Sequence, residues 1–161
     1  MGGYRGPSPS VTSVDEVSID IGATPEQVYG LVTDVTNMGR WSPECHRCEW
    51  LDGASGPAVG AKFKGWNTRG PMRWSTVSTV VEADAPHTFA WEVDQSRMRW
   101  GYRFEPSAGG TKVTEFRDEL GPKPRYVRIA YKLRLLGKDP DAIVRAGMKE
   151  TLNRLKAGAE T

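Results

Sequence analysis

A stretch near the C-terminus imposes the strongest constraint on this chain, because residues 139–158 form one long amphipathic pattern. Asp139 can cap a helix with its carboxylate, and Pro140 suits the first helical position. A lone helix with so wide a buried side needs a large surface to cover it, and the rest of the chain must supply that surface. The residues that share this side, at three- and four-residue spacing, are Ile143, Val144, Gly147, Met148, Thr151, Leu152 and Leu155.

Most of the upstream sequence alternates with the two-residue period of β-strands. Between the first two strands, Thr24-Pro25-Glu26-Gln27 is a capping box that predicts a short helix, and a second turn is predicted at 36–40. This order predicts an α+β fold, in which a curved antiparallel sheet wraps around the long C-terminal helix. The predicted strands are 14–21, 46–51, 61–68, 72–82, 87–93, 97–105 and 111–120.

Length and charge limit the classes of protein that this chain can belong to. The 161 residues suit one domain at 12–158, preceded by a Gly-, Pro- and Ser-rich tail at 1–11 that is predicted to be disordered and that lacks the apolar region of a secretory signal. The formal net charge of +2 is too small to predict nucleic-acid binding. No apolar run approaches the roughly 20 residues of a membrane-spanning helix, so we expect a cytoplasmic protein.

Two cysteines, Cys45 and Cys48, raise the question of a metal or redox site. With His46 they supply at most three ligands, whereas structural zinc takes four, and no thioredoxin-like unit surrounds them. We therefore expect structural thiols, with adventitious metal or redox chemistry as the alternative. Gly-rich phosphate-binding motifs are absent, and neither a cofactor nor a metal is predicted.

Three short motifs accompany this order of elements: Ala-Thr-Pro-Glu-Gln-Val-Tyr at 23–29, Met-Gly-Arg-Trp-Ser-Pro at 38–43 and Val-Gly-Ala-Lys-Phe at 59–63. With the closing helix, they make residues 12–158 resemble the START-like helix-grip superfamily (SRPBCC), in its polyketide cyclase/dehydrase-type branch. The resemblance implies a deep, mostly apolar cavity between sheet and long helix that holds lipids, sterols, polyketides or other hydrophobic small molecules. Some members catalyse cyclisation or dehydration there, and many only bind or carry, so the resemblance does not decide between these functions.

If this cavity is present, strand residues that face the long helix line it. Aromatic walls with a few polar groups provide apolar area for burial and hydrogen bonds for orientation. The alternative is that these side chains simply pack a core, because alternation alone does not distinguish a filled interior from a hollow one. The candidates are Phe63, Asn67, Trp74, Thr76, Trp91, Trp100 and Tyr102, with Met148 and Leu152 from the helix and Trp41 near the entrance.

Glu115 and Tyr102 are the candidates for moving a proton. Glu115 shares one face of the last strand with Arg117. Buried together, they would anchor the polar end of a ligand, or Glu115 would act as a general acid with a raised pKa. The more frequent arrangement, which we expect here, is a solvated pair on the outer face with Phe116 turned inward. His46 and His87 lie near turns, where we expect surface positions and no Ser-His-Asp triad.

The segment 123–138 is basic and amphipathic, with no acidic residue between Gly121 and Lys138. Pro122 and Pro124 predict that any helix begins near Arg125. Three interpretations stay open: transient contact with an anionic membrane surface, a lid over the cavity mouth, or a helix that packs its apolar side in the ordinary way.

The favoured hypothesis is binding of a hydrophobic small molecule between the sheet and the long helix. The first alternative is a cyclase/dehydrase-type enzyme, which requires an ionisable group with a perturbed pKa inside the cavity. The second is a regulatory or interaction protein, with a filled interior and an exposed apolar patch. The ligand's identity and the oligomeric state are left open by the sequence.

Overall fold

The computed structural model describes residues 13–161, and the tail predicted at 1–11 lies outside the described residues. The predicted order of elements is confirmed, and the strand ends differ from prediction by no more than two residues. The elements are β1 (Ser13–Ile21), α1 (Pro25–Thr33), a 3-10 turn η1 (Val35–Asn37), α2 (Met38–Trp41), β2 (Cys45–Trp50), β3 (Lys62–Arg69), β4 (Met72–Asp84), β5 (Thr88–Val93), β6 (Met98–Ser107), β7 (Gly110–Glu119), α3 (Arg125–Lys132) and α4 (Pro140–Ala159).

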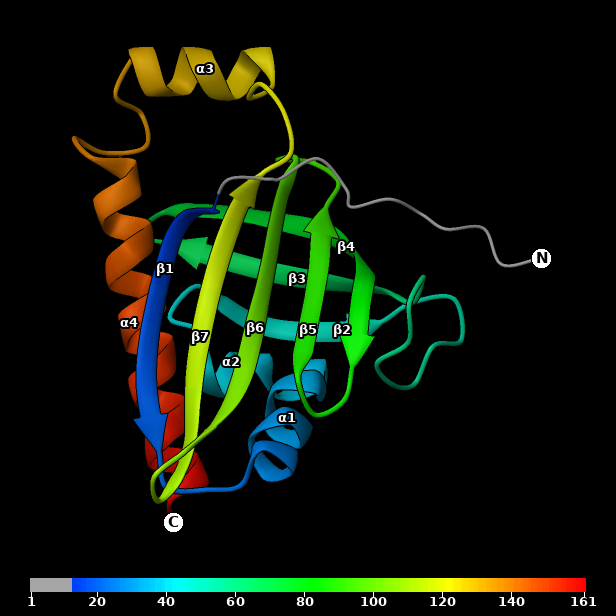
Figure 1. Cartoon of the computed structure of the whole chain (residues 1–161). Helices are drawn as coiled ribbons and strands as arrows, with labels where there is room; N and C mark the ends of the chain where they lie inside the picture. Colours follow the sequence, from blue (N-terminus) through cyan, green and yellow to red (C-terminus); the bar gives the residue numbers. More distant parts are fainter. Residues whose placement is uncertain (1–12) are drawn as a thin grey trace.

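Within residues 13–161, seven strands form one antiparallel sheet in the order β1-β7-β6-β5-β4-β3-β2. The long strand β4 joins its two halves: residues 72–79 pair with β3, and residues 78–84 pair with β5. The pairing with β5 shifts between Val80 and Glu82, and such a bulge bends a strand. As a result β2, β3 and β4 cross behind the other strands, and the sheet encloses a concave face (Figure 1).

The capping box predicted before the first helix is confirmed. The Gln27 backbone N–H donates to the Thr24 hydroxyl at 3.2 Å, and the Thr24 N–H donates to the Gln27 side chain at 3.0 Å. This cap fixes the start of α1, which buries Val28, Tyr29 and Val32. The Tyr29 ring packs edge-on against Phe104 at 5.5 Å between centroids, so α1 closes one end of the concave face.

Replacing Thr24 by Ala should lower the free energy of unfolding by about 1 kcal/mol, because the hydroxyl that caps α1 is lost. Urea unfolding followed by tryptophan fluorescence would measure this change. Thr24→Ser keeps the hydroxyl and should stay near wild type. An equal loss in both variants would show that the methyl group, and not the cap, contributes the stability.

The long helix α4 runs beside β1 (Figure 1). Its cap is also confirmed, since Asp139 accepts a hydrogen bond from the Ala142 N–H at 3.0 Å. Part of the predicted buried side is wrong: Ile143 is 39% exposed, and burial is complete only from Met148 onward. The first turns of α4 lie against charged residues, and Arg145 bonds to Asp15 of β1, so apolar side chains there have no apolar surface to cover.

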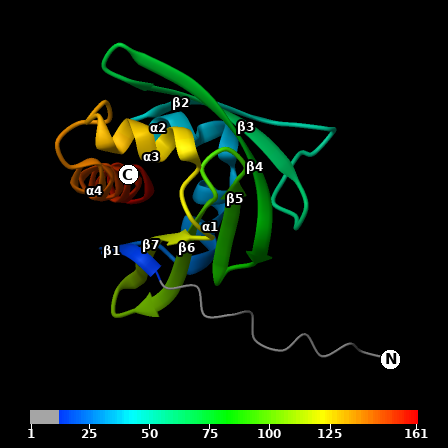
Figure 2. The ribbon, with the colours of Figure 1, turned by 90° about the horizontal axis from the view of Figure 1, so that it is seen from above.

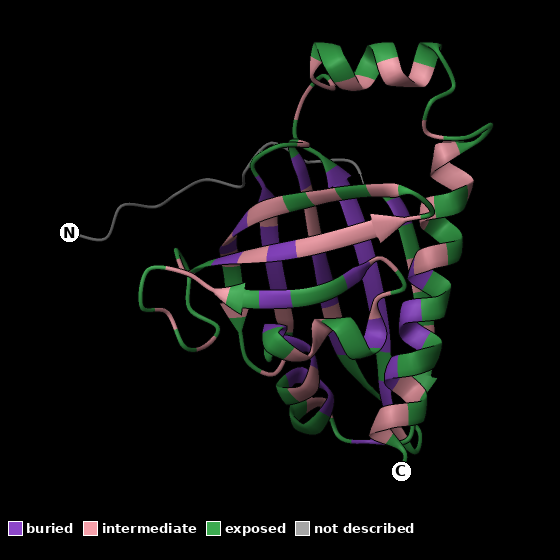
Figure 3. Cartoon of the chain, turned by 180° about the vertical axis from the view of Figure 1, so that it is seen from behind, coloured by how far each residue is buried: buried purple, intermediate pink, exposed green. Residues whose placement is uncertain are grey.

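Helix α3 begins at Arg125, as Pro122 and Pro124 predicted. It lies at the end of the sheet opposite α1 and α2 (Figure 1). Across its described residues Arg125–Lys132 none is buried, and Figure 3 shows only exposed and intermediate positions there. Packing of its apolar side is therefore incomplete, because Val127, Ala130 and Tyr131 are half-buried whereas Tyr126, Ile129 and Leu133 are exposed. No helix within residues 13–161 has the length and apolar content needed to cross a bilayer.

Candidate functional site

The inner part of the concave face is packed by aromatic side chains. The rings of Phe63 and Trp91 are 5.8 Å apart, those of Trp91 and Tyr102 are 6.0 Å apart, and those of Tyr102 and Phe104 are 6.3 Å apart. All four side chains are buried. Of the candidates for cavity lining, Phe63, Trp91 and Tyr102 thus pack against one another in this structure and form the floor of the concave face.

Toward α3 the concave face is more open. Trp100 and Thr76 are half-buried, although they share strands and orientation with buried neighbours. Trp100 lies opposite Trp91 in the β5–β6 register, and Thr76 lies opposite Gly65, whose missing side chain would point at Cys45 of the inner face. Solvent therefore reaches the concave face at these two inward-facing residues.

Two other candidates belong to a separate depression. Asn67 and Trp74 are paired across the end of the β3–β4 hairpin. They border an open groove of about 310 Å³, together with His46, Trp66, Arg73 and Ser75. The structure thus groups Asn67 and Trp74 with the turn end of the β3–β4 hairpin and not with Trp91, Trp100 and Tyr102.

The remaining candidates are packed. Met148 and Leu152 of α4 are almost fully buried. Trp41, which we expected near an entrance, is buried in α2 with its ring against Gly158, near the C-terminal end of α4. Its indole nitrogen has no hydrogen-bond partner among residues 13–161.

Glu115 is the chemically distinctive residue of the concave face. It is 6% exposed, so the expected outer-face position is wrong. Burial raises the pKa of its carboxyl to about 8, and the hydrogen bond with Tyr102 opposes this rise. Its Oε2 atom is buried and has no hydrogen-bond partner within the described residues. Near neutral pH the carboxyl is therefore mostly protonated, and one of its oxygens is unpaired.

The strand register explains why Glu115 points inward. It lies between Val17 of β1 and Tyr102 of β6, on the same face as the fully buried Val113. Phe116, which we expected to turn inward, lies on the opposite face instead. There it is buried beneath the Arg103 guanidinium at 4.9 Å, in the space that the absent side chain of Gly101 leaves.

Tyr102 contributes a second polar group to this position. Its ring is buried, and burial followed by the nearby Glu115 carboxyl raises the pKa of its hydroxyl well above the usual value. The hydroxyl therefore stays protonated at physiological pH. Tyr102 and Glu115 together form a neutral, proton-bearing pair within an aromatic surface.

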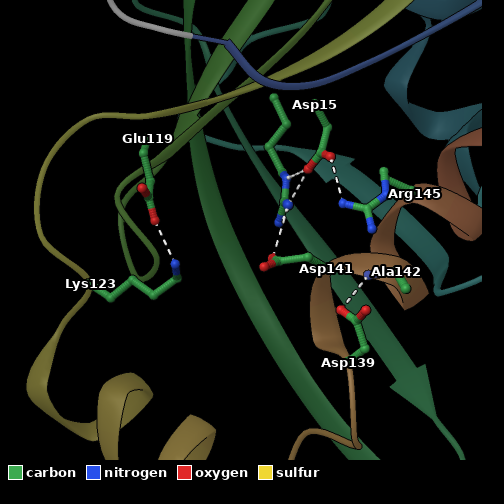
Figure 4. Close-up of polar contacts among 8 residues, drawn as sticks. Asp15, Glu119, Lys123, Asp139, Asp141, Ala142 and Arg145 are labelled. Atoms are coloured by element: carbon green, nitrogen blue, oxygen red, sulfur yellow. Dashed lines mark hydrogen bonds and ion pairs between the residues drawn. The ribbon is translucent and has the colours of Figure 1, made fainter.

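We had considered a buried pair of Arg117 and Glu115, but Arg117 pairs with two aspartates instead. Its Nε donates to Asp15 Oδ2 at 2.9 Å, and its Nη2 also donates to Asp15 and, at 3.2 Å, to Asp141 of α4. Arg145 donates to the other Asp15 oxygen at 3.1 Å, as Figure 4 shows for Asp15 and Arg145. The Arg117 guanidinium also lies 5.8 Å from the Trp100 ring centre. This ion-pair cluster ties β1 and β7 to α4.

The pKa of the Asp15 carboxyl is lowered although the group is buried. Burial alone would raise it, but hydrogen bonds and charges from Arg117 and Arg145 lower it below the usual value. Alternation in the sequence indicated that Asp15 would be buried, because residues two and four positions apart on a strand share a face and Val17 and Ile19 point inward. Its partner Arg117 lies 102 positions away, and no local pattern connects the two.

The two cysteines are buried and free. A register shift between Cys45 and Arg47 turns both thiols to the inner face, where the hydrogen bond that the Cys48 thiol donates to Cys45, together with burial, raises the pKa of Cys48. Both histidines, His46 and His87, are exposed, as predicted. Residues 13–161 hold no group of three or more side chains that could bind a metal ion.

Comparison with known proteins agrees with this architecture. The family profile described as "Polyketide cyclase / dehydrase and lipid transport" matches residues 14–160. The Polyketide_cyc-like protein Cgl2372 from Corynebacterium glutamicum is 33% identical, with a TM-score of 0.52, and the match covers 92% of this chain and 90% of that one.

Two more distant structures share the fold. Protein CV1439 from Chromobacterium violaceum is 16% identical, has a TM-score of 0.68, and matches over 91% of this chain and 97% of its own. TTHA0849 from Thermus thermophilus is also 16% identical, with a TM-score of 0.67 over 89% and 94% of the two chains. No curated protein matches this chain.

Proposed function

Since this chain belongs to the polyketide cyclase/dehydrase and lipid transport family, we propose that it binds a hydrophobic small molecule against its concave face, between the sheet and α4. The observation that carries the proposal is the buried, unpaired Oε2 of Glu115. An unsatisfied buried polar atom lowers stability, and a ligand that pairs with it removes this cost. The ligand would enter where Trp100 and Thr76 are half-buried.

The surroundings of Glu115 define the class of ligand. Trp91, Trp100 and Tyr102 offer apolar area, which suits a ligand with a flat or hydrophobic body. A mostly protonated carboxyl donates a hydrogen bond, so the ligand would carry an acceptor such as a carbonyl oxygen. We therefore propose an apolar molecule with at least one carbonyl or comparable acceptor.

The raised pKa of Glu115 also supports a second candidate function, an enzyme of the cyclase/dehydrase type. A carboxyl with a pKa of about 8 can give a proton to a ligand oxygen or take one from an adjacent carbon near neutral pH. In this reading Glu115 is the general acid or base. Tyr102 would hold the Glu115 carboxyl in position and supply a second hydroxyl.

Two substitutions at one position separate binding from catalysis. Glu115→Gln keeps the size of the side chain and a hydrogen-bond donor but does not transfer a proton. Glu115→Leu removes the donor as well. A carrier predicts that Gln retains binding of a carbonyl-bearing aromatic probe while Leu weakens it. An enzyme predicts in addition that Gln abolishes turnover of a poly-carbonyl substrate while leaving its binding within a few-fold.

The measurement begins with native mass spectrometry of the gently purified protein and organic extraction of any bound molecule. Fluorescence titration of the variants with the extracted class of ligand follows. Glu105→Gln, at an exposed carboxyl of β6, is the matched control. No bound mass and no fluorescence change across a panel of apolar carbonyl compounds would contradict the proposed function.

Trp100→Ala should weaken binding of such a ligand by about ten-fold or more, because it removes aromatic area beside Glu115. Its effect on folding should be smaller than its effect on binding, since Trp100 is only half-buried. Trp66→Ala is the control, because Trp66 is equally half-buried but lies on the outer face beneath Arg47 and Lys64. Equal losses of binding in the two variants would mean that the concave face is not the site.

A further inference from the structure

The segment from α3 to the start of α4 concentrates positive charge. Between Gly121 and Lys138 it carries six basic residues and no acidic one, although the whole chain has a net charge of only +2. The rest of the chain is therefore net acidic, and the protein has a strongly positive end. That end also exposes large apolar side chains: Tyr126 by 62%, Ile129 by 48%, Leu133 by 62% and Leu135 by 68%.

The charges and the apolar groups form two neighbouring stripes on α3. Tyr126, Ile129 and Leu133 follow one another at helical spacing, and so do Arg125, Arg128 and Lys132. The basic stripe and Ile129 border an open groove of about 360 Å³. The half-buried residues of the helix are on its third side, and all six side chains of the two stripes are exposed.

Polar contacts hold α3 near each of its two ends. The Tyr126 hydroxyl donates to the Gln95 carbonyl, in the β5–β6 turn, at 2.6 Å. Near the other end, Tyr131 contacts Asp141 in the first turn of α4, and Asp141 also pairs with Arg117. Seen from above, α3 crosses between the two halves of the sheet at this end of the molecule (Figure 2).

We propose that residues 123–138 dock on the surface of a lipid bilayer that contains anionic lipids. A basic stripe beside exposed aromatic and aliphatic side chains is the chemistry of a helix that lies in the interface plane. Anionic headgroups attract each nearby Lys or Arg, and the apolar stripe enters the boundary of the acyl chains. The helix protrudes from one end of the molecule, where a flat surface can reach it without meeting α1 or α2 (Figure 1).

Docking in this orientation turns the open end of the concave face toward the lipid. Trp100 and the Asp15–Arg117 pair lie at the α3 end of the strands, opposite α1. A hydrophobic ligand would then pass between bilayer and protein over a short path with little exposure to water. The docking itself does not depend on the proposed ligand, because the basic and apolar stripes lie outside the concave face.

Co-sedimentation of the full chain with vesicles tests the proposal. We expect binding to vesicles of phosphatidylcholine mixed with phosphatidylglycerol, little binding to phosphatidylcholine alone, and a steep loss of binding as salt is added. Arg125→Glu with Arg128→Glu should lower the affinity by at least about five-fold for each basic residue removed. Ile129→Ser with Leu133→Ser should lower it too, and should leave the salt dependence unchanged.

The matched control is Lys112→Glu with Lys149→Glu, two exposed lysines on β7 and α4, outside the docking segment. Circular dichroism should show all variants folded, since the substituted α3 side chains are not buried. Absence of vesicle binding, or equal loss in the control, overturns the proposal. Titration with a carbonyl-bearing aromatic probe without vesicles tests the concave face separately. A helix that serves only as a lid would be recognised by changed probe binding in the α3 variants with no vesicle association. A helix that binds an acidic protein would show unchanged probe binding with no vesicle association.

Discussion

Asp15→Asn is expected to lower the free energy of unfolding by about 3–5 kcal/mol at pH 7, because it breaks a buried ion pair and leaves one partner charged. The side chains of Asp15 and Arg117 are only 3% and 7% exposed. After the substitution, Arg117 would retain Asp141, whose side chain is 42% exposed and whose bond is long at 3.2 Å. Urea unfolding of both proteins at pH 7 measures the difference.

The pH dependence of this difference identifies its cause. The folded-state pKa of Asp15 is lowered, so its contribution to stability is present above the ordinary aspartate value of about 3.8 and is lost as pH falls through the lowered folded-state pKa. The gap between wild type and Asp15→Asn should therefore close in acid. Glu49→Gln, which breaks the exposed pair with Arg47, should cost less than about 1 kcal/mol. A gap that stays constant into acid would mean that lost packing, and not charge, destabilises the variant.

Glu115→Gln should change how the stability of the protein depends on pH. In the unfolded chain this carboxyl loses its proton near the ordinary value of 4.5, whereas the folded protein holds the proton until about pH 8. Between these values the folded state binds more protons, so the stability of the wild type falls as pH rises. The shift corresponds to a loss on the order of 5 kcal/mol across the interval. In Glu115→Gln this side chain does not titrate, so the variant should not lose this stability as pH rises.

Unfolding in urea at several pH values between 4 and 9 would show the effect as a difference between the two curves, since all other groups titrate alike in both. Wild type should be the less stable protein above pH 8 and should gain on the variant as pH falls. Glu105→Gln, at an exposed carboxyl, should follow the wild type throughout. Parallel curves for wild type and Glu115→Gln would show that Glu115 ionises normally and would remove the support for a neutral donor in the concave face.

The elements of this fold were predictable because each depends on neighbours in the sequence. The capping box at Thr24 and the cap at Asp139 are contacts between residues three positions apart, and the start of α3 follows from the prolines directly before it. Strand positions followed from alternation, and their order was enough to predict a curved sheet around a terminal helix. The family resemblance supplied the expectation of a concave binding face.

The orientation of the charged residues was predicted less well. Alternation shows that Glu115 and Arg117 share a face, but it does not show which face is inner, and the more frequent arrangement was the wrong one here. Ile143 was placed with the buried side of α4 because its spacing fits, yet the neighbouring strand ends are charged there. In both cases the burial of the residue depends on the side chains that another helix or strand places against it.

The sequence by itself therefore determined the order and type of the elements, their caps and turns, and the strong positive charge of residues 123–138. Only the tertiary structure decided that Asp15 meets Arg117, that Glu115 lies beside Tyr102 with one oxygen unpaired, and that α3 leaves its apolar stripe exposed. The physical reason is the sequence separation over which each interaction acts. Backbone capping and periodicity act over a few residues, whereas burial and pKa depend on groups as far as 130 positions apart, such as Asp15 and Arg145.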